Sequence, residues 1–243
     1  MIQSLKISIL QKNISTKISK ELKQKIQTSK SDFLILPSFF PSSKETESNI
    51  IQNEKLYLDS ILEISEYYKG VILGGTFLRE FEGKILESIP IVQDIQLIDW
   101  YDAEISSGVF STKTEKGHTD KIFILGKTRF ALATTNEILQ EKNLEYFQKE
   151  KIEVVFNPTL NIYSDDTIYT KELEDFFKLS QKYNLNIFRI CAFGDLGKHL
   201  LQGRSFHSSP TGIKWKMAAS ENQIEIFKTL NVNIEGGILS FKG

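Results

Sequence analysis

The order of strand-like and helical segments repeats once along the 243 residues, and this repeat most constrains the fold. In the first half, the strand-like run "LKISIL" precedes a helical segment, the strand "FLILPS", a second helix and "YYKGVILGGT". In the second half, "RFALAT" precedes a helix, "VVFNPT", another helix and "KYNLNIFRICAF". Strands that alternate with helices are typical of proteins whose helices cover their sheets. We therefore expect an α/β fold in which two strand-helix-strand-helix-strand halves pack as facing sheets, with the helices outside.

Apolar periodicity gives the expected extents of these elements. The strand-like runs are residues 5–10, 33–36, 71–73, 89–92, 95–98, 122–125, 130–133, 154–156 and 187–192. Helical periodicity covers residues 18–29, 54–68, 138–149 and 171–183, with Asn53 and Thr170 placed as N-caps. The segments 80–125 and beyond 195 contain turn signals such as "EFEGKIL" and "PTG", which predict β-hairpins that extend the sheets.

Composition and charge exclude several functional classes. The balance of 30 Lys and Arg against 31 Asp and Glu gives a net charge of -1, so we expect neither nucleic-acid binding nor attraction to an anionic membrane. Apolar runs are far shorter than the roughly 20 residues that span a bilayer, so we expect a cytoplasmic protein with one domain over residues 1–243. The single cysteine, Cys191, excludes an internal disulfide and a multi-cysteine metal site.

Polar side chains follow several of the predicted strands. In "DFLILPSFFP" the apolar run ends at Pro37, and the small hydroxyl residue Ser38 comes next. Residues just past the carboxyl ends of strands usually face the binding crevice of an α/β fold. We therefore expect the crevice to be lined by strand-end residues, which are Gln11, Ser38, Gly74, Thr134, Thr135, Asn157, Thr159 and Ala192.

The order and endings of these segments resemble the carbon-nitrogen hydrolase family, the nitrilase and amidase superfamily, over nearly the whole chain. "KISILQKN" is similar to the opening strand of the family, and "DFLILPSFFP" to the segment that carries its catalytic glutamate. "RFALATTNEI" resembles the strand and turn that bear its nucleophilic cysteine, and "QGRSFHSSPTGI" resembles its closing hairpin. The resemblance implies a four-layer α-β-β-α sandwich.

The same resemblance implies a glutamate base, a nucleophilic cysteine and a lysine that stabilises the tetrahedral intermediate. The glutamate position is Ser38, and the cysteine position is Thr135, or Thr134 if the register differs by one residue. The lysine position is Asp102 in "WYDAEIS", or Ala103 in the other register. The family's asparagine after a later strand is also replaced, here by Phe193, which we expect to line the pocket.

These replacements argue against the chemistry of the family. Serine has no basic group at neutral pH, and Asp102 would repel a developing oxyanion. Ser and Thr at strand ends commonly satisfy local backbone groups, which is the simplest role for Ser38, Thr134 and Thr135. We therefore expect a non-catalytic homologue that acts as a small-ligand-binding, regulatory or scaffold protein. The alternative is an active amide hydrolase with a rearranged site.

Three further expectations concern partners. His118, His199 and His207 lack metal-ligand spacing, so we expect no metal, and nothing in the sequence calls for a cofactor. A small-molecule ligand is expected in the crevice. We also expect a homodimer, because family members commonly pair through helices that match the helical segment 171–183 here.

Overall fold

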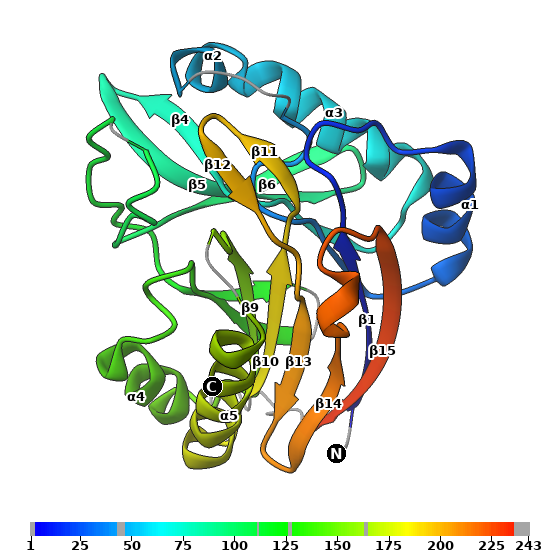
Figure 1. Ribbon diagram of the computed structural model, residues 1–243, viewed down its shortest axis with the longest axis vertical. Helices are drawn as coiled ribbons and strands as arrows, with labels where there is room; N and C mark the ends of the chain where they lie inside the picture. Colours follow the sequence, from blue (N-terminus) through cyan, green and yellow to red (C-terminus); the bar gives the residue numbers. More distant parts are fainter. Residues whose placement is uncertain (1–2, 43–46, 111, 126–127, 163–164, 236–243) are drawn as a thin grey trace, which may run out of the picture.

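Two large β-sheets face each other, and helices lie on their outer faces (Figure 1). The computed structural model describes residues 3–42, 47–110, 112–125, 128–162 and 165–235. The first sheet contains segments from both ends of the chain, and the second contains segments from its second half only.

The first sheet has seven strands in the order β15-β1-β2-β3-β5-β4, with β6 also paired to β5. Its parallel centre, β1 to β3, comes from the first half of the repeat. The strands are β1 (Gln3–Gln11), β2 (Phe33–Ile35), β3 (Val71–Leu73), β4 (Phe77–Phe81), β5 (Lys84–Gln93), β6 (Gln96–Asp102) and β15 (Ile226–Ile234). The β4–β5 turn is Glu82-Gly83, and both residues have positive φ, as a two-residue hairpin turn requires.

The second sheet has six strands in the order β14-β13-β10-β9-β8-β7. Its parallel centre, β8 to β10, comes from the second half of the repeat. The strands are β7 (Ile122–Leu125), β8 (Thr128–Leu132), β9 (Val154–Thr159), β10 (Asn186–Cys191), β13 (Phe206–Ser209) and β14 (Gly212–Lys216). A small hairpin of β11 (Gly194–Leu196) and β12 (His199–Leu201) and the short 3-10 helix η1 (Ala219–Glu221) complete this half.

Five α-helices are found among the described residues, which are α1 (Lys20–Ser29), α2 (Glu47–Gln52), α3 (Glu54–Tyr67), α4 (Glu141–Lys149) and α5 (Asp166–Tyr183). The prediction that Thr170 caps the last helix is wrong, because α5 begins a turn earlier, where Asp165 accepts a hydrogen bond from the Ile168 amide at 2.7 Å. A carboxylate at this position satisfies an otherwise unpaired amide of the first turn. Within the described part of the chain, no helix has the length and apolar character needed to cross a membrane.

Aromatic side chains fill the space between the sheets. Phe33 of β2 contacts Phe130 and Phe156 of the second sheet, with ring centroids 5.1 and 5.3 Å apart. Two further apolar clusters lie outside the sheets, where α1 and α3 cover the first sheet and α4 and α5 cover the second. The order of layers is therefore helix, sheet, sheet, helix, which confirms the predicted α-β-β-α sandwich.

Candidate functional site

The carboxyl ends of the parallel strands of the two sheets lie near one another. The chain just after β1 and the chain just after β10 form a parallel bridge between Asn13 and Phe193, so both sheets direct their strand ends to the same region (Figure 1). This is the region in which the sequence predicts a crevice lined by strand-end residues. The loop that follows β6 also reaches this region, because the Asn136 side-chain amide donates a hydrogen bond to the Ser106 carbonyl at 2.8 Å.

Ser38 lies just past β2 and is fully buried. Its hydroxyl oxygen has no hydrogen-bond partner among the described residues. The backbone on either side is held closely, because the Phe39 amide donates to the Thr76 carbonyl at 2.7 Å. A Cβ placed on Gly75 would lie only 1.8 Å from the Pro37 carbonyl oxygen. The position that resembles the family's glutamate therefore has a fixed backbone, and its hydroxyl cannot take up a proton at neutral pH.

Thr135 lies three residues after β8 and is partly exposed. Its hydroxyl oxygen accepts hydrogen bonds from the Thr159 hydroxyl at 2.8 Å and from the Leu160 amide at 3.2 Å. Both donors reduce the electron density available on that oxygen for attack on a carbonyl carbon. Asn157 ties the same strand ends together, since its side-chain amide donates to the Ala133 carbonyl at 2.6 Å.

Gln11 ends β1, and Phe193 follows β10 and lies beside the chain just after β1. Gln11 is buried, and its carbonyl oxygen accepts from both the amide and the hydroxyl of Ser205, each at 3.0 Å. Its amide nitrogen donates to the carbonyls of Glu221 and Ile224. Phe193 is bound through its backbone amide to the Lys12 carbonyl at 3.1 Å. Gln11 therefore binds the segment after β12 rather than offering free polar groups to a ligand.

The two possible lysine positions face different surroundings. Asp102 binds Arg79 through both carboxylate oxygens, at 2.7 and 2.9 Å, and accepts from the Ser88 hydroxyl at 2.5 Å. Ala103 lies in the apolar cluster between the sheets, next to Tyr101. Because side chains alternate along a strand, Tyr101 and Ala103 face the other sheet, whereas Asp102 between them does not. Neither register provides a cation in the crevice.

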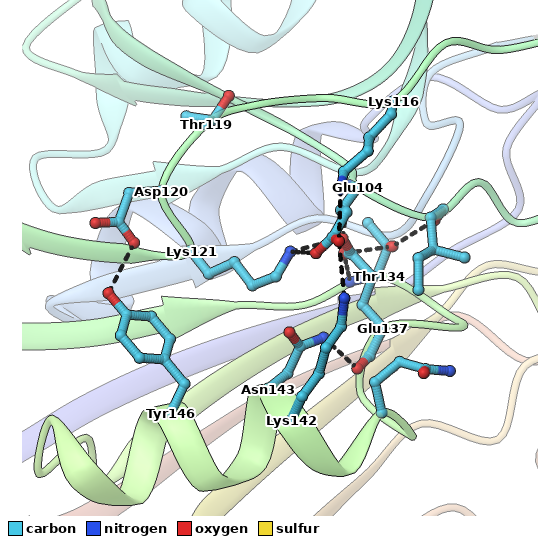
Figure 2. A network of polar contacts seen from close by, with 12 residues as sticks. Glu104, Lys116, Thr119, Asp120, Lys121, Thr134, Glu137, Lys142, Asn143 and Tyr146 are labelled. Atoms are coloured by element: carbon cyan, nitrogen blue, oxygen red, sulfur yellow. Dashed lines mark hydrogen bonds and ion pairs between the residues drawn. The ribbon is translucent and has the colours of Figure 1, made fainter.

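A buried carboxylate, Glu137, organises the turn after β8 (Figure 2). It accepts hydrogen bonds from five donors, which are the Tyr101 hydroxyl at 2.5 Å, the Thr134 hydroxyl at 2.7 Å, the Thr134 amide at 2.9 Å, the Glu104 amide at 2.7 Å and the Lys121 ammonium at 3.0 Å. Burial by itself would raise the pKa of Glu137, but the Lys121 charge and these donors outweigh it and lower the pKa. Glu137 is therefore ionised at neutral pH and a weak base.

Lys121 links this buried carboxylate to an open cleft on the surface. Its ammonium lies 3.3 Å from Glu104, whose carboxylate also binds Lys116 at 2.9 Å and Lys142 at 2.8 Å (Figure 2). Hydrogen bonds from Lys142 and Lys116 lower the pKa of Glu104 to about 2. The cleft has a volume of about 410 Å³, and Glu104 neutralises part of the lysine charge within it.

Glu87 is a buried acid that the sequence analysis did not identify. One carboxylate oxygen accepts from the Ser107 amide at 2.8 Å and the Ser106 hydroxyl at 3.2 Å, whereas the other has no partner among the described residues. Burial raises the pKa of Glu87 because no cation offsets the loss of hydration. The available signal was a glutamate at the inward position of an alternating strand, two residues before Ile89.

The sequence does not predict that Glu104 and Lys121 lie beside Glu137, for a related reason. Lys121 and Glu104 lie outside regular secondary structure, where periodicity predicts neither burial nor contacts. Within the described ranges, no group of three or more His, Cys, Asp or Glu side chains is arranged to hold a metal ion. Of the predicted site residues, Thr135 and Thr159 are joined by a direct hydrogen bond, and Asn157 bonds to the carbonyl of Ala133, next to Thr134.

No protein-family model matches the sequence, and no curated protein matches it significantly. Solved structures nevertheless match its fold. A carbon-nitrogen hydrolase from Helicobacter pylori G27 has a TM-score of 0.75 at 11% identity, over 93% of this chain and 88% of that one. A mutant of the Nesterenkonia AN1 amidase from the nitrilase superfamily has a TM-score of 0.73 at 11% identity, over 95% of this chain and 90% of that one.

A glutamine-dependent NAD+ synthetase from Acinetobacter baumannii has a TM-score of 0.74 at 17% identity. The match covers 94% of this chain but only 45% of the synthetase, so the present chain spans about half of that protein. At such identities the likeness shows a common fold. It does not transfer the activity of any of these proteins.

Proposed function

We propose that this chain, which has the fold of the carbon-nitrogen hydrolases of the nitrilase superfamily, binds a small molecule at its strand-end crevice without hydrolysing it. The observation that carries the proposal is the state of Thr135. Its oxygen accepts two hydrogen bonds, and neither donor is a base that could remove its proton. The other expected positions provide the uncharged Ser38 and either Asp102, which Arg79 binds, or the apolar Ala103.

The energetic argument supports a loss of catalysis. A thiol titrates near 8.5, and an alcohol is weaker by on the order of five units, so an alkoxide costs roughly 7 kcal/mol more to form than a thiolate. A well-placed base and an oxyanion donor could offset this cost. The positions that resemble the family's base and lysine provide neither.

A second candidate function is amide hydrolysis with Thr134 as nucleophile and Glu137 as base. One observation favours it, because the Thr134 hydroxyl lies 2.7 Å from a Glu137 oxygen, within reach for proton transfer. The lowered pKa of Glu137 and its five donors disfavour it, since a carboxylate so well stabilised takes up a proton poorly. Both Thr134 and Glu137 are also fully buried.

Hydrolysis assays distinguish the two candidates. We expect the protein to hydrolyse simple amides, nitriles and carbamoyl compounds no faster than the uncatalysed rate. Turnover that disappears in Thr134→Ala but survives in Thr28→Ala, which removes an exposed hydroxyl on α1, would establish the second candidate. Turnover that depends on Thr135 or Cys191 would instead place a nucleophile at that residue and refute the non-catalytic proposal.

Restoring the family's residues tests whether the scaffold remains competent. The combined variant Ser38→Glu, Ala103→Lys, Thr135→Cys places the lysine on the face between the sheets. The matched variant with Asp102→Lys in place of Ala103→Lys puts the lysine beside Arg79, on the other face. If activity can be restored, we expect it in the first variant only, because residues that act as one unit are strongly non-additive.

The proposed biological role is that of a ligand sensor, regulatory subunit or scaffold in the cytoplasm. A homodimer through α5 is part of the proposal. Leu173 and Phe176 of α5 are buried against the second sheet, whereas Ile168 is 45% exposed and available to a partner. A dimer mass in light scattering at micromolar concentration, reduced to a monomer mass by Ile168→Glu, would support this interface. A monomer mass for the unmodified protein would contradict it.

A further inference from the structure

The strand-end crevice is closed in this structure. Of the residues predicted to line it, only Thr135 is partly exposed, and Ser38, Thr134 and Asn157 are at most 1% exposed. A small molecule at the surface can therefore reach very little of the predicted lining. Binding in the crevice requires that a covering segment moves.

Residues 105–110, in the loop that follows β6, bridge the two sides of the crevice. On the side of the first sheet, the Phe110 ring lies against Phe39, just beyond β2, with centroids 4.9 Å apart. On the side of the second sheet, the Ser106 carbonyl accepts a hydrogen bond from the Asn136 side chain, beyond β8, at 2.8 Å. We call this segment the β6 loop, and it is the covering segment that the contacts identify.

The β6 loop is held by side chains rather than by its backbone. Among the described residues, no backbone–backbone hydrogen bond joins residues 105–110 to another segment. The backbone is fixed before the loop, where the Ala103 amide donates to the Glu87 carbonyl at 2.8 Å. It is fixed again after the loop, where the Glu115 amide donates to the Ile85 carbonyl at 2.7 Å. Segments that lack such hydrogen bonds open at a lower free-energy cost than strands or helices, so the loop is the part of this region best able to move.

Glu87 of β5 provides polar contacts that hold the β6 loop in place. This carboxylate is 1% exposed, and it accepts from the Ser107 amide at 2.8 Å and from the Ser106 hydroxyl at 3.2 Å. A buried carboxylate without a cation is costly in its ionised form. Because the loop contacts Glu87 directly, opening the loop hydrates the carboxylate and closing the loop buries it. The charge of Glu87 is therefore coupled to the position of the loop.

We propose that residues 105–110 form a lid over the strand-end crevice, that Glu87 is its latch, and that a ligand enters the crevice when the lid opens. Protonation of Glu87 removes the buried charge and so stabilises the closed lid. The opening of the lid is a property of this chain alone, whereas its role in ligand entry rests on the proposed function.

The lid should open more readily as the pH rises. Burial raises the pKa of Glu87 in the closed state, and Glu137 raises it further to a smaller extent. Opening returns this pKa toward its ordinary value near 4.3, so the closed lid binds the proton more tightly. The neighbouring groups keep their charge between about pH 5 and pH 8, because the pKa values of Glu137 and Glu104 are lowered and that of Tyr101 is raised. Lys121 pairs with both Glu104 and Glu137 (Figure 2).

Hydrogen exchange of the Ser107 amide, followed by NMR, tests the lid without any ligand. The measured rate divided by the intrinsic rate at the same pH gives the opening constant. We expect this constant to rise from pH 5 toward pH 8, by up to about tenfold per pH unit, because opening releases one proton. In Glu87→Gln the constant should not depend on pH, whereas the control Glu115→Gln, which changes an exposed acid beyond the loop, should keep the rise. The Ala103 amide, which is held by the backbone of β5, should show no such rise.

Thiol labelling tests whether the lid controls entry to the crevice. Ser38→Cys places a thiol at a buried crevice position, and iodoacetamide is the probe. At pH 8 this thiol should react more slowly in combination with Glu87→Gln than in combination with Glu115→Gln. The buried Cys191 should react equally in both variants.

Three results would overturn the proposal. They are an opening constant of the unmodified protein that does not depend on pH, a full rise that persists in Glu87→Gln, and equal alkylation of Ser38→Cys in the two combined variants. If Ser38→Cys fails to fold, the exchange measurements decide. A failure to detect a crevice ligand would refute the proposed function but would change none of these results, so the two proposals are tested separately.

Discussion

Replacing Glu137 by glutamine should destabilise the protein without changing the size of the side chain. The carboxylate accepts from three donors on one oxygen and from two, the Glu104 amide and the Lys121 ammonium, on the other. A glutamine that keeps the first three hydrogen bonds must direct its own NH₂ group at the last two donors. Lys121, which is 8% exposed, then loses its nearest carboxylate.

Removing one partner of a buried ion pair costs roughly 3–5 kcal/mol, because the remaining charge stays buried and unpaired. Lys121 retains Glu104 at 3.3 Å, so we expect the lower end, about 3 kcal/mol. For a protein of this length each kcal/mol lowers Tm by about 2–4 °C, which gives a fall of about 6–12 °C.

Urea denaturation at several pH values provides the assay. Because the folded-state pKa of Glu137 is lowered, its contribution is complete above the unfolded-state value, near 4.3, and is lost as the pH falls through the folded-state value. The difference between Glu137→Gln and the unmodified protein should therefore be constant near neutral pH and shrink in acid. Glu145→Gln, at an exposed position of α4, is the control and should leave the free energy of unfolding unchanged. A loss below about 1 kcal/mol for Glu137→Gln at pH 7 would refute the reasoning, since it would show that the network is not held by the ion pair.

Other predictions concern the remaining buried groups. Because the pKa of Glu87 is raised, this residue should make the unmodified protein less stable as the pH rises above about 4.3. The free energy of unfolding of Glu87→Gln should therefore increase relative to that of the unmodified protein toward neutral pH. A difference in urea denaturation that does not depend on pH would contradict this. Gly75→Ala should lower the free energy of unfolding by about 3 kcal/mol or prevent folding, because its Cβ would meet the Pro37 carbonyl. Gly83→Ala, which lies in open space at positive φ, should lower it by only about 1–2 kcal/mol in the same assay. Phe156→Ala should cost about 3–5 kcal/mol by removing a ring from the cluster between the sheets, and a Tm unchanged by calorimetry would contradict that packing.

The layers of the fold were predictable because they depend on apolar periodicity. The strand "FLILPS" and the strand "VVFNPT" both place phenylalanine on the inner face, and the two rings, Phe33 and Phe156, meet in the structure. The ends of elements were less predictable. Helix α5 begins at Asp166 rather than at residue 171, because the side-chain cap at Asp165 lies outside the apolar pattern.

The polar groups of the candidate site were harder to predict, since they depend on orientation and on contacts distant in sequence. Whether Asp102 or Ala103 faces the crevice is decided by the phase of β6, which a one-residue change in register reverses. The partners of Glu137 come from three separate segments, which contain Tyr101 and Glu104, Lys121, and Thr134. No local pattern in the sequence indicates that these segments meet.

The pairing of β1 with β15 also sets the order in which the chain can fold during synthesis. The nine paired positions join Gln3 to Ile234 and Gln11 to Ile226, so almost the entire chain separates the two strands. At about 5–20 residues per second, the ribosome needs roughly 10–40 s to make the partner of β1 after β1 itself. During that time one edge of β1 has no strand to pair with, and an unpaired edge is a site for association with other chains. Nascent chains that end before β15 should therefore be the species that most require a chaperone.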